Sequence, residues 1–360
     1  MLELRNISKT VGGATHIHPT SLVLPRGSLN VLLGPTLSGK TSLMRLMAGL
    51  DKPSEGSILF DGQDVTGMPV QKRNVAMVYQ QFINYPALTV YENIASPMRI
   101  AGKAQSEIDS EVRKAADLLK LTPYLDRTPL NLSGGQQQRT AIARAIVKKA
   151  NLVLLDEPLA NLDYKLREEL REELPRIFAE SGAIFVYATT EPSEALLLGG
   201  NTAALSEGRI TQFGRTIDVY RRPLDLVTAR TFADPPLNTA RMVKSGDRFL
   251  RADRPAIAVP SQLADISDGP LTIAFQPHHL LVRPAENATV PIRARTLVSE
   301  IAGSESFIHL DYEGDRWVML AHGIQIVEPD REIEVYLDTR HLMAFDETGR
   351  AVGRTVGLAA

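Results

Sequence analysis

The chain has no cysteine, which excludes disulfide bonds, zinc–thiolate sites and thiol nucleophiles. It also lacks a surplus of basic residues: its formal net charge is −2, so its composition does not indicate a nucleic-acid partner. No apolar run approaches the ~20 residues that a membrane-spanning helix needs, and no signal peptide opens the sequence. We therefore expect a cytoplasmic protein that reaches a membrane only through a partner.

One stretch of the sequence has the spacing G-x-x-x-x-G-K-[ST], which is typical of a phosphate-binding loop. Its glycines let backbone N–H groups turn toward phosphate oxygens, and the helix that follows adds the positive end of its dipole. Lys40 would reach the β- and γ-phosphates, and the Thr41 hydroxyl would bind magnesium. A chance match in a turn is disfavoured by the apolar strand before the loop and the amphipathic helix after it. The predicted ATP-binding residues are Gly34, Pro35, Thr36, Leu37, Ser38, Gly39, Lys40, Thr41 and Ser42.

Short apolar runs and helical periodicity predict an α/β architecture for the first part of the chain. Residues 75–79, 152–155 and 184–187 suit strands that are buried on both faces. Residues 105–120 form an amphipathic pattern with Ser106 as a candidate cap, and a second helix begins after Asp163. We expect Pro175 to kink or end that second helix.

The pattern changes near Pro235, where we place a domain boundary. Beyond it come short alternating strands at residues 271–275, 307–310, 317–320 and 333–337, with Trp317 as a core residue. We therefore predict an ATPase domain over residues 1–235, with a helical insertion at about 82–150. A small all-β barrel domain is predicted over residues 236–360.

A second motif, which is acidic, follows the apolar run at residues 152–155. Asp156 and Glu157 end this run, and a strand this apolar disfavours the alternative of an ordinary solvated strand end. The motif resembles the acidic motif of loop-type nucleotidases. The resemblance implies that Asp156 helps to hold magnesium and that Glu157 polarises the attacking water.

Residues 132–139 resemble the signature of ATP-binding-cassette (ABC) ATPases, and they stand at the same place before the acidic motif. In that family the signature lies at a helix N-terminus and touches the γ-phosphate held by a second subunit. The resemblance assigns this role to Ser133, Gly134, Gly135 and Gln136. It makes Gln80 the glutamine that senses magnesium and water, so that Thr41, Gln80 and Asp156 form the expected magnesium set. Asp163 matches the aspartate that couples the two sites.

Further resemblance covers nearly the whole chain and points to the sugar and glycerol-phosphate importer branch. Residues 90–94, the stretch from Gly208 to Pro223 and the β tail carry it. The implied fold is a P-loop NTPase cassette followed by an OB-like (TOBE) domain that serves dimerisation and regulation. The implied cofactors are ATP and Mg²⁺. The implied partners are a second cassette ATPase, two integral membrane permease subunits and, indirectly, a solute-binding protein. The chain would sit on the cytoplasmic face of the membrane and power uptake of a sugar, a glycerol phosphate or a polyol such as glycerol.

Three positions depart from the family pattern. The phosphate loop lacks the glycine usually found between Pro35 and Ser38. Val11 stands where the family stacks an aromatic ring on adenine, and Thr190 stands where the family has a switch histidine. Threonine is shorter than histidine and carries no positive charge. We expect one degenerate ATP site and pairing with a different cassette chain, although compensation by neighbouring groups is the simpler alternative.

Three functions compete on the sequence alone. The first is an importer ATPase, and the second is a cassette ATPase that acts on nucleic acid or ribosomes. The third is a mainly regulatory nucleotide-binding subunit with little hydrolysis at its own site. The single cassette, the net charge and the tail disfavour the second. For an importer, the apolar loop after Gln80 (Phe82, Ile83, Tyr85 and Leu88) is the expected surface for a short helix of a membrane subunit.

Overall fold

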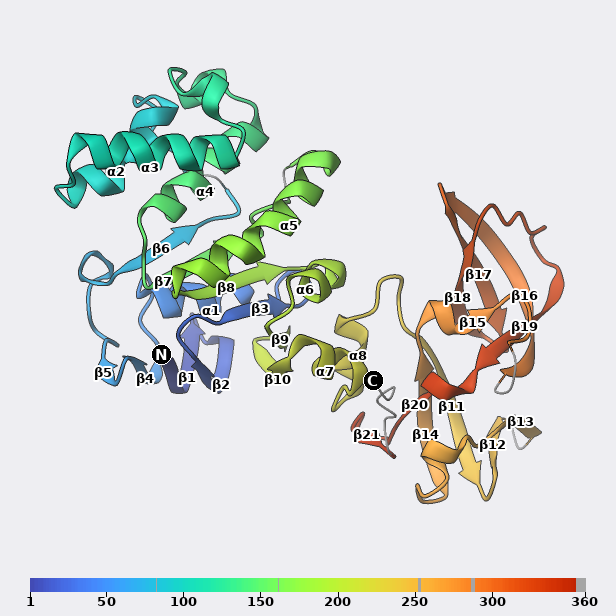
Figure 1. Cartoon of the computed structure of the whole chain (residues 1–360). Coiled ribbons are helices and arrows are strands. Elements are labelled where there is room, and N and C mark those ends of the chain that lie inside the picture. The colour runs from blue at the N-terminus through green and yellow to red at the C-terminus, as the bar shows by residue number, and fades with distance from the viewer. Residues whose placement is uncertain (82, 161, 252–253, 286–288, 354–360) are drawn as a thin grey trace. The chain divides into compact units, whose positions relative to one another are not determined.

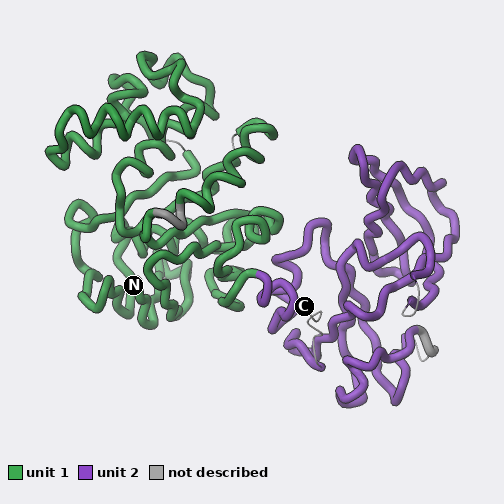
Figure 2. The backbone as a smooth tube through the Cα atoms, in the orientation of Figure 1, with its two compact units in different colours: residues 1–216 green, residues 217–360 purple. Residues whose placement is uncertain are grey.

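The computed structural model describes residues 1–81, 83–160, 162–251, 254–285 and 289–353. The chain divides into two compact units, unit 1 (residues 1–216) and unit 2 (residues 217–360) (Figure 2). None of the helices in these described ranges has the length and apolar character of a membrane span. Phe82, one residue of the expected partner surface, lies outside the described residues.

Unit 1 combines an antiparallel sheet, a mainly parallel sheet and a group of helices (Figure 1). Its strands are β1 (Leu2–Val11), β2 (Ala14–Leu24), β3 (Leu29–Leu33), β4 (Glu55–Phe60), β5 (Gln63–Asp64), β6 (Val75–Val78), β7 (Leu152–Asp156), β8 (Ile184–Thr189), β9 (Asn201–Ser206) and β10 (Arg209–Arg215). Its helices are α1 (Lys40–Ala48), α2 (Val90–Ile100), α3 (Gln105–Leu118), α4 (Gly134–Val147), α5 (Tyr164–Ser181) and α6 (Pro192–Leu198), with 3-10 turns η1 (Val70–Lys72), η2 (Thr122–Tyr124) and η3 (Pro129–Asn131).

The six-stranded sheet has the order β10-β9-β3-β8-β7-β6, and β3, β6, β7, β8 and β9 run parallel. The predicted strands at residues 75–79, 152–155 and 184–187 are confirmed as β6, β7 and β8. In the register, Leu33 faces Thr189 and Asp156 faces Ala188. The segments that follow β3, β7 and β8 therefore leave the sheet at one edge, which brings motifs distant in sequence together.

Helices α2, α3 and α4 are grouped at the end of unit 1 that lies away from β4 and β5 (Figure 1). Helix α3 is confirmed, but Ser106 is not its cap: the N-cap residue is Ala104, whose side chain has no group to accept a hydrogen bond. Asp163 does cap α5, because its Oδ1 accepts the Leu166 N–H at 3.0 Å. Pro175 does not end α5, which continues to Ser181.

Unit 2 contains two antiparallel sheets around one apolar core. Its strands are β11 (Asn238–Ser245), β12 (Arg248–Arg251), β13 (Arg254–Ala258), β14 (Gly269–Phe275), β15 (Leu280–Leu281), β16 (Thr289–Ala302), β17 (Glu305–Tyr312), β18 (Asp315–His322), β19 (Glu332–Asp338), β20 (Met343–Phe345) and β21 (Ala351–Val352). Helices α7 (Thr216–Arg221) and α8 (Leu226–Thr231) precede them, and η4 (Ser261–Leu263), η5 (Pro277–His279) and η6 (Thr339–His341) connect them.

Trp317 is a core residue of unit 2, as predicted. It is fully buried, stacks on Tyr312 with ring centroids 4.2 Å apart, and meets Phe275 edge-on at 4.9 Å. Its indole N–H donates to the Thr239 carbonyl at 3.0 Å, so the polar end of the ring is satisfied. The four predicted strands are confirmed within β14, β17, β18 and β19.

The boundary between the units falls before the expected one at residue 235, because α8 packs with the C-terminal strands. The Leu226 N–H donates to the Gly349 carbonyl at 2.8 Å, and the Ala351 N–H donates to the Leu224 carbonyl at 2.9 Å. Ala229 of α8 also shares a small apolar cluster with Phe345. These contacts join residues 217–235 to unit 2.

Three histidines lie together in unit 2, on η5 and η6: His279 stacks on His341 and meets His278 edge-on. The ring centroids of His278 and His279 lie 4.2 Å apart, and those of His279 and His341 lie 4.3 Å apart. The Nδ1 atom of His279 is buried, and no described part of the chain offers it a hydrogen-bond partner. Burial, reinforced by His278 and His341, lowers the pKa of His279 to about 3. Its imidazole is therefore neutral at neutral pH.

Acidification is expected to destabilise unit 2 through His279. Its pKa in the fold, about 3, lies below the ordinary value of 6.5, so the unfolded chain binds the proton more readily. The neutral His279 therefore does not reduce the free energy of unfolding above pH 6.5. Between pH 6.5 and about 3, the free energy of unfolding falls by at most about 1.4 kcal/mol per pH unit. Equilibrium unfolding followed by the fluorescence of Trp317, the only tryptophan, measures this loss.

A leucine at position 279 removes the titrating group and keeps a similar volume. His279→Leu is expected to lose less stability than the native chain between about pH 7 and about pH 4. His322→Leu, at an exposed histidine of the same unit, serves as the control. Equal losses in the native chain and His279→Leu would contradict the assignment.

Candidate functional site

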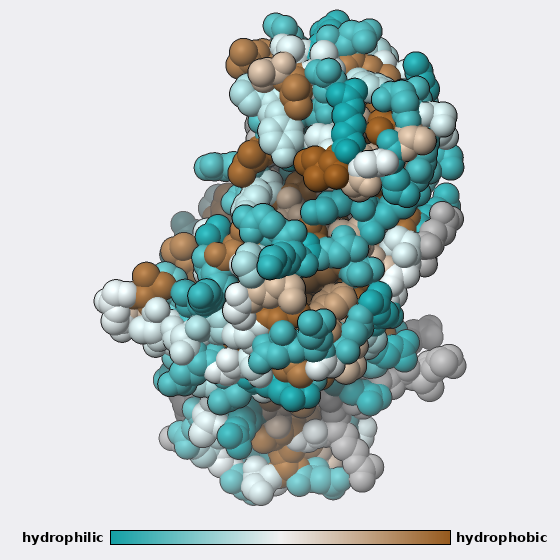
Figure 3. Space-filling view, turned by 90° about the vertical axis from the view of Figure 1, so that its left-hand side faces the viewer, coloured by the Kyte–Doolittle hydropathy of each residue, from teal (hydrophilic) through white to brown (hydrophobic). Residues whose placement is uncertain are grey.

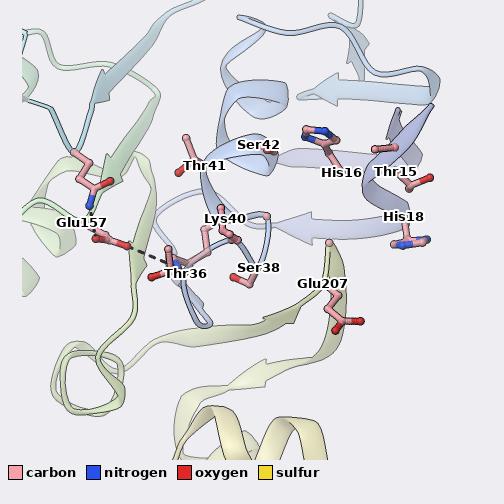
Figure 4. A pocket seen from close by; sticks show the side chains of 15 residues that line it. Thr15, His16, His18, Thr36, Ser38, Lys40, Thr41, Ser42, Glu157 and Glu207 are labelled. Carbon is pink, nitrogen blue, oxygen red and sulfur yellow. Dashed lines mark hydrogen bonds and ion pairs between the residues drawn. The ribbon is translucent and has the colours of Figure 1, made fainter. Parts of the chain in front are cut away.

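A cleft of about 660 Å³ opens around the predicted phosphate loop (Figure 4). The loop and the start of α1 form one wall, and β2 and the β9–β10 turn form another. Gln80 and Glu157 come from the ends of β6 and β7. The lining residues are Ala14, Thr15, His16, His18, Thr36, Leu37, Ser38, Gly39, Lys40, Thr41, Ser42, Gln80, Glu157, Glu207 and Gly208.

The backbone of the loop needs its glycines at two positions. A Cβ atom at Gly34 would lie 2.3 Å from the Leu205 carbonyl oxygen, and Gly39 has a φ of 102°, in the left-handed region. Leu37, which replaces the usual glycine, has a φ of 67°. Its side chain is 95% exposed, so it meets no neighbour that would prevent this conformation. The loop therefore keeps a curled backbone at a local cost of about 1–2 kcal/mol.

Ser38 lies inside the loop with its hydroxyl unsatisfied. Its side chain is buried, and its Oγ atom has no hydrogen-bond partner among the described residues. Its backbone carbonyl accepts the Gly208 N–H at 2.9 Å, which ties the loop to the β9–β10 turn. A buried hydroxyl without a partner is costly, so the loop offers a donor suited to a phosphate oxygen.

Lys40 is the cation of the loop, and it is almost fully buried. Its Nζ atom donates to the carbonyl oxygens of Gly34 at 2.8 Å and Pro35 at 3.0 Å, and lies 3.7 Å from Glu157 Oε1. Burial lowers the pKa of Lys40, and the carboxylates of Glu157 and Asp156 oppose that shift. Because water solvates this ammonium poorly, an anionic ligand that contacts it would gain binding affinity.

Thr41 and Asp156 meet at the base of the cleft. The Thr41 hydroxyl donates to Asp156 Oδ2 at 2.8 Å. Burial raises the pKa of Asp156, and the bond from Thr41 and the charge of Lys40 oppose that rise. A hydroxyl and one carboxylate suit Mg²⁺, which prefers oxygen ligands and takes its others from water and phosphate. The residues present therefore fit a magnesium–nucleotide complex.

Glu157 lies at the edge of the cleft in a left-handed conformation, with a φ of 46°. Its N–H donates to the Ala188 carbonyl at 3.0 Å, and its carbonyl accepts Gln138 Nε2 at 3.3 Å. Its carboxylate accepts Gln80 Nε2 at 2.9 Å (Figure 4). Such a backbone conformation in a non-glycine residue needs support from its surroundings, and these bonds fix the carboxylate beside Lys40.

The predicted signature stands apart from this cleft. Ser133 is the N-cap of α4 and forms a reciprocal capping box with Gln136, at 3.3 and 2.9 Å. Gly134 and Gly135 form the first turn, and Ser133 and Gly134 are exposed. Asp163 is exposed too. The signature therefore presents a helix N-terminus to solvent, and neither it nor Asp163 lines the chain's own cleft.

Val11 and Thr190 also lie outside the lining of the cleft. Val11 ends β1 and is half exposed. Thr190 is exposed and directly follows β8, whose last residue, Thr189, accepts the Gly34 N–H through its carbonyl at 3.4 Å. Thr190 is thus next in sequence to a residue that contacts the phosphate loop.

The sequence motifs did not identify the wall formed by β2 and the β9–β10 turn. Ala14, Thr15, His16 and His18 line it, together with Glu207 and Gly208. The only available signal was the Glu207-Gly208 turn, which predicted a hairpin but not its contact with β2. Gln138, which binds the Glu157 carbonyl, lies just beyond the signature and was also not predicted.

The sequence matches known transport ATP-binding proteins over nearly its whole length. Residues 17–160 match a family model described as ABC transporter. The trehalose/maltose import ATP-binding protein MalK of Thermococcus litoralis is 33% identical, over 98% of this chain and 99% of that protein. The alpha-glucoside transport ATP-binding protein AglK of Rhizobium meliloti is 34% identical, over 97% and 98%. The sn-glycerol-3-phosphate import ATP-binding protein UgpC of Pectobacterium atrosepticum is 34% identical, over 87% and 88%.

A solved structure resembles part of the fold. It is the dimeric ATP-binding cassette MJ0796 in a post-hydrolysis state, bound to ADP and Pi. It has 27% sequence identity and a TM-score of 0.55, and the match covers 60% of this chain and 99% of that one.

Proposed function

Because this chain belongs to the ATP-binding subunits of ABC transporters, we propose that it powers import of a sugar, a glycerol phosphate or a related polyol. It binds and hydrolyses ATP, and separate membrane subunits carry the solute. The observation that supports this most strongly is that one cleft brings together the phosphate loop, Gln80 and Glu157. The test is solute uptake into vesicles that contain the chain and its permease subunits. Uptake should require enclosed ATP, and uptake without ATP would refute the function.

Residues of the cleft have distinct tasks in the proposed reaction. The loop N–H groups, Ser38 and Lys40 hold the phosphates. Glu157 orients the attacking water and accepts its proton, and Gln80 holds the carboxylate in place through the bond at 2.9 Å. Thr41, Asp156 and Gln80 would hold Mg²⁺, which neutralises phosphate charge when it is bound.

The signature of this chain completes the site of a second cassette. Ser133, Gly134, Gly135 and Gln136 offer a hydroxyl, backbone N–H groups and a helix dipole suited to an anion. Ser133 and Gly134 are exposed, so this helix N-terminus is accessible to a partner's nucleotide. Asp163 caps α5 and would couple the two sites.

The partner is proposed to be a different cassette chain. Thr190 replaces the switch histidine, and the loss of one oriented contact to the γ-phosphate costs on the order of 3 kcal/mol in a transition state. A homodimer would carry that defect twice. A partner that keeps the histidine would instead provide one strong site, completed by Ser133 of this chain.

The alternative of a mainly regulatory subunit is not favoured. The relatives at 33–34% identity are all named as import or transport ATP-binding proteins. The chain also keeps Lys40, Asp156 and Glu157 in one place, as hydrolysis requires.

A groove of about 240 Å³ between β6, α2 and α4 is the proposed contact with a membrane subunit. Apolar patches lie on the upper part of the face drawn in Figure 3. Arg144 in the groove lies over the Tyr85 ring at 5.0 Å, and Lys148 Nζ donates to the Val75 carbonyl at 2.6 Å. Burial lowers the pKa of both cations, and no carboxylate of the described residues forms an ion pair with either. A segment of the membrane subunit with an apolar face would pack against this groove, and an acidic side chain on it would pair with the two cations.

Ile100→Asp is expected to uncouple transport from hydrolysis. Ile100 lines the groove at the end of α2 and is 86% exposed, so the change should leave folding and the basal ATPase rate of the isolated chain intact. Solute uptake should fall at least about 10-fold, because the aspartate removes apolar contact and competes for the two cations. Leu197→Asp, at an exposed leucine of α6 in the same unit, is the control. Normal uptake by Ile100→Asp would count against the groove as the contact.

A further inference from the structure

The nucleotide cleft extends beyond the phosphate loop to a wall that carries two histidines. Ala14, His16 and His18 are alternate residues of β2, and all three line the cleft. Ile17, between the histidines, is buried in the core on the opposite face of the strand. Figure 4 shows His16 and His18 on one side of the cleft and Glu157 on the other.

Backbone contacts hold this wall at a fixed position relative to the phosphate loop. The Gly208 N–H donates to the Ser38 carbonyl, and the Gly208 carbonyl accepts the His18 N–H, each at 2.9 Å. A Cβ atom at Gly208 would lie 2.3 Å from the His16 carbonyl oxygen, so only glycine allows this approach. One residue therefore joins the loop to the histidine strand.

A nucleotide whose phosphates occupy the loop must place its base elsewhere in the cleft. Val11, the position expected to meet adenine, does not line the cleft, whereas His16 lines it and is exposed. An imidazole is a planar aromatic ring on which a base can stack. We propose that His16, supported by His18, is the binding surface for the purine base. This assignment rests on the proposed ATP binding. It means that the absence of an aromatic ring at Val11 does not lower the affinity for ATP.

The test compares the affinity of the full chain for ATP and for inorganic triphosphate, which has no base. His16→Ala is expected to weaken ATP binding by about 5- to 150-fold, the range for loss of one stacked base. It should leave the affinity for inorganic triphosphate unchanged. His16→Phe should restore ATP affinity, because it returns an aromatic face, and His18→Ala should give a smaller loss than His16→Ala.

Val11→Ala is the matched control and should bind ATP normally. Three results would overturn the proposal: unchanged ATP affinity in His16→Ala, equal losses for ATP and inorganic triphosphate, or a loss confined to Val11→Ala. A native chain that binds neither compound would instead refute the phosphate site itself. Failure of the base assignment is therefore distinguishable from failure of the proposed function.

Discussion

Replacing Lys40 with alanine is expected to lower the affinity of the chain for ATP by about 100-fold or more. Lys40 is the only side-chain cation among the described residues of the phosphate loop, and its Nζ atom is held by the Gly34 and Pro35 carbonyls. Its buried ammonium is poorly solvated in the free chain, so a triphosphate gains more from it than from an exposed lysine. Equilibrium binding of labelled ATP to the isolated chain measures the effect.

Two further variants separate binding from folding. Lys40→Met keeps most of the buried volume without the charge and should lose as much affinity as Lys40→Ala. Lys114→Ala, at an exposed lysine of α3, should bind ATP normally. Circular dichroism should give the same helix content for all three. Unchanged affinity in folded Lys40→Ala would remove the phosphate-loop assignment.

Ser133→Arg is expected to reduce the ATPase rate of the assembled transporter far more than Glu157→Gln does. Ser133 would complete the partner's strong site, and an arginine there would obstruct the γ-phosphate. Glu157 would serve this chain's own site, which Thr190 weakens. A deficit on the order of 3 kcal/mol would make that site slower than the partner's by up to about 100-fold, although it keeps the groups that hydrolysis requires. Glu157→Gln should therefore leave most of the rate, whereas Ser133→Arg should remove at least about 90% of it.

The two changes are made in this chain alone, and steady-state phosphate release is measured on the complete assembly. Thr190→His in this chain should increase the contribution of its own site and make Glu157→Gln more damaging. If Glu157→Gln eliminated hydrolysis while Ser133→Arg had no effect, the strong site would be this chain's own, which would contradict the proposal.

The sequence predicted the elements whose determinants are local. The phosphate loop and the acidic motif each follow an apolar strand, and parallel pairing of β3, β7 and β8 brings their carboxyl ends to one edge. The cap of α5 at Asp163 is also a local property. Sequence order was sufficient for these features, because each motif carries its own strand or helix.

Features that depend on distant contacts were not predictable in the same way. Strand β2 forms a wall of the cleft because the β9–β10 turn binds it at Gly208. The two segments lie roughly two hundred residues apart in the sequence, so no local pattern indicates this contact. Helix α5 continues through Pro175 because Leu166, Leu170 and Leu174 anchor one face in the core. The end of unit 1 was set by α8, whose partners are the last strands of the chain.

The subunit composition of the native complex shows directly whether this chain is half of a heterodimeric importer ATPase. The complex is purified from native membranes through a tag on this chain, and its subunits are identified and counted by mass spectrometry. We expect one copy of this chain, one copy of a different cassette ATPase that has a histidine at the switch position, and two integral membrane subunits. A complex with two copies of this chain and no second ATPase would contradict the heterodimer, and a complex without membrane subunits would contradict the importer itself.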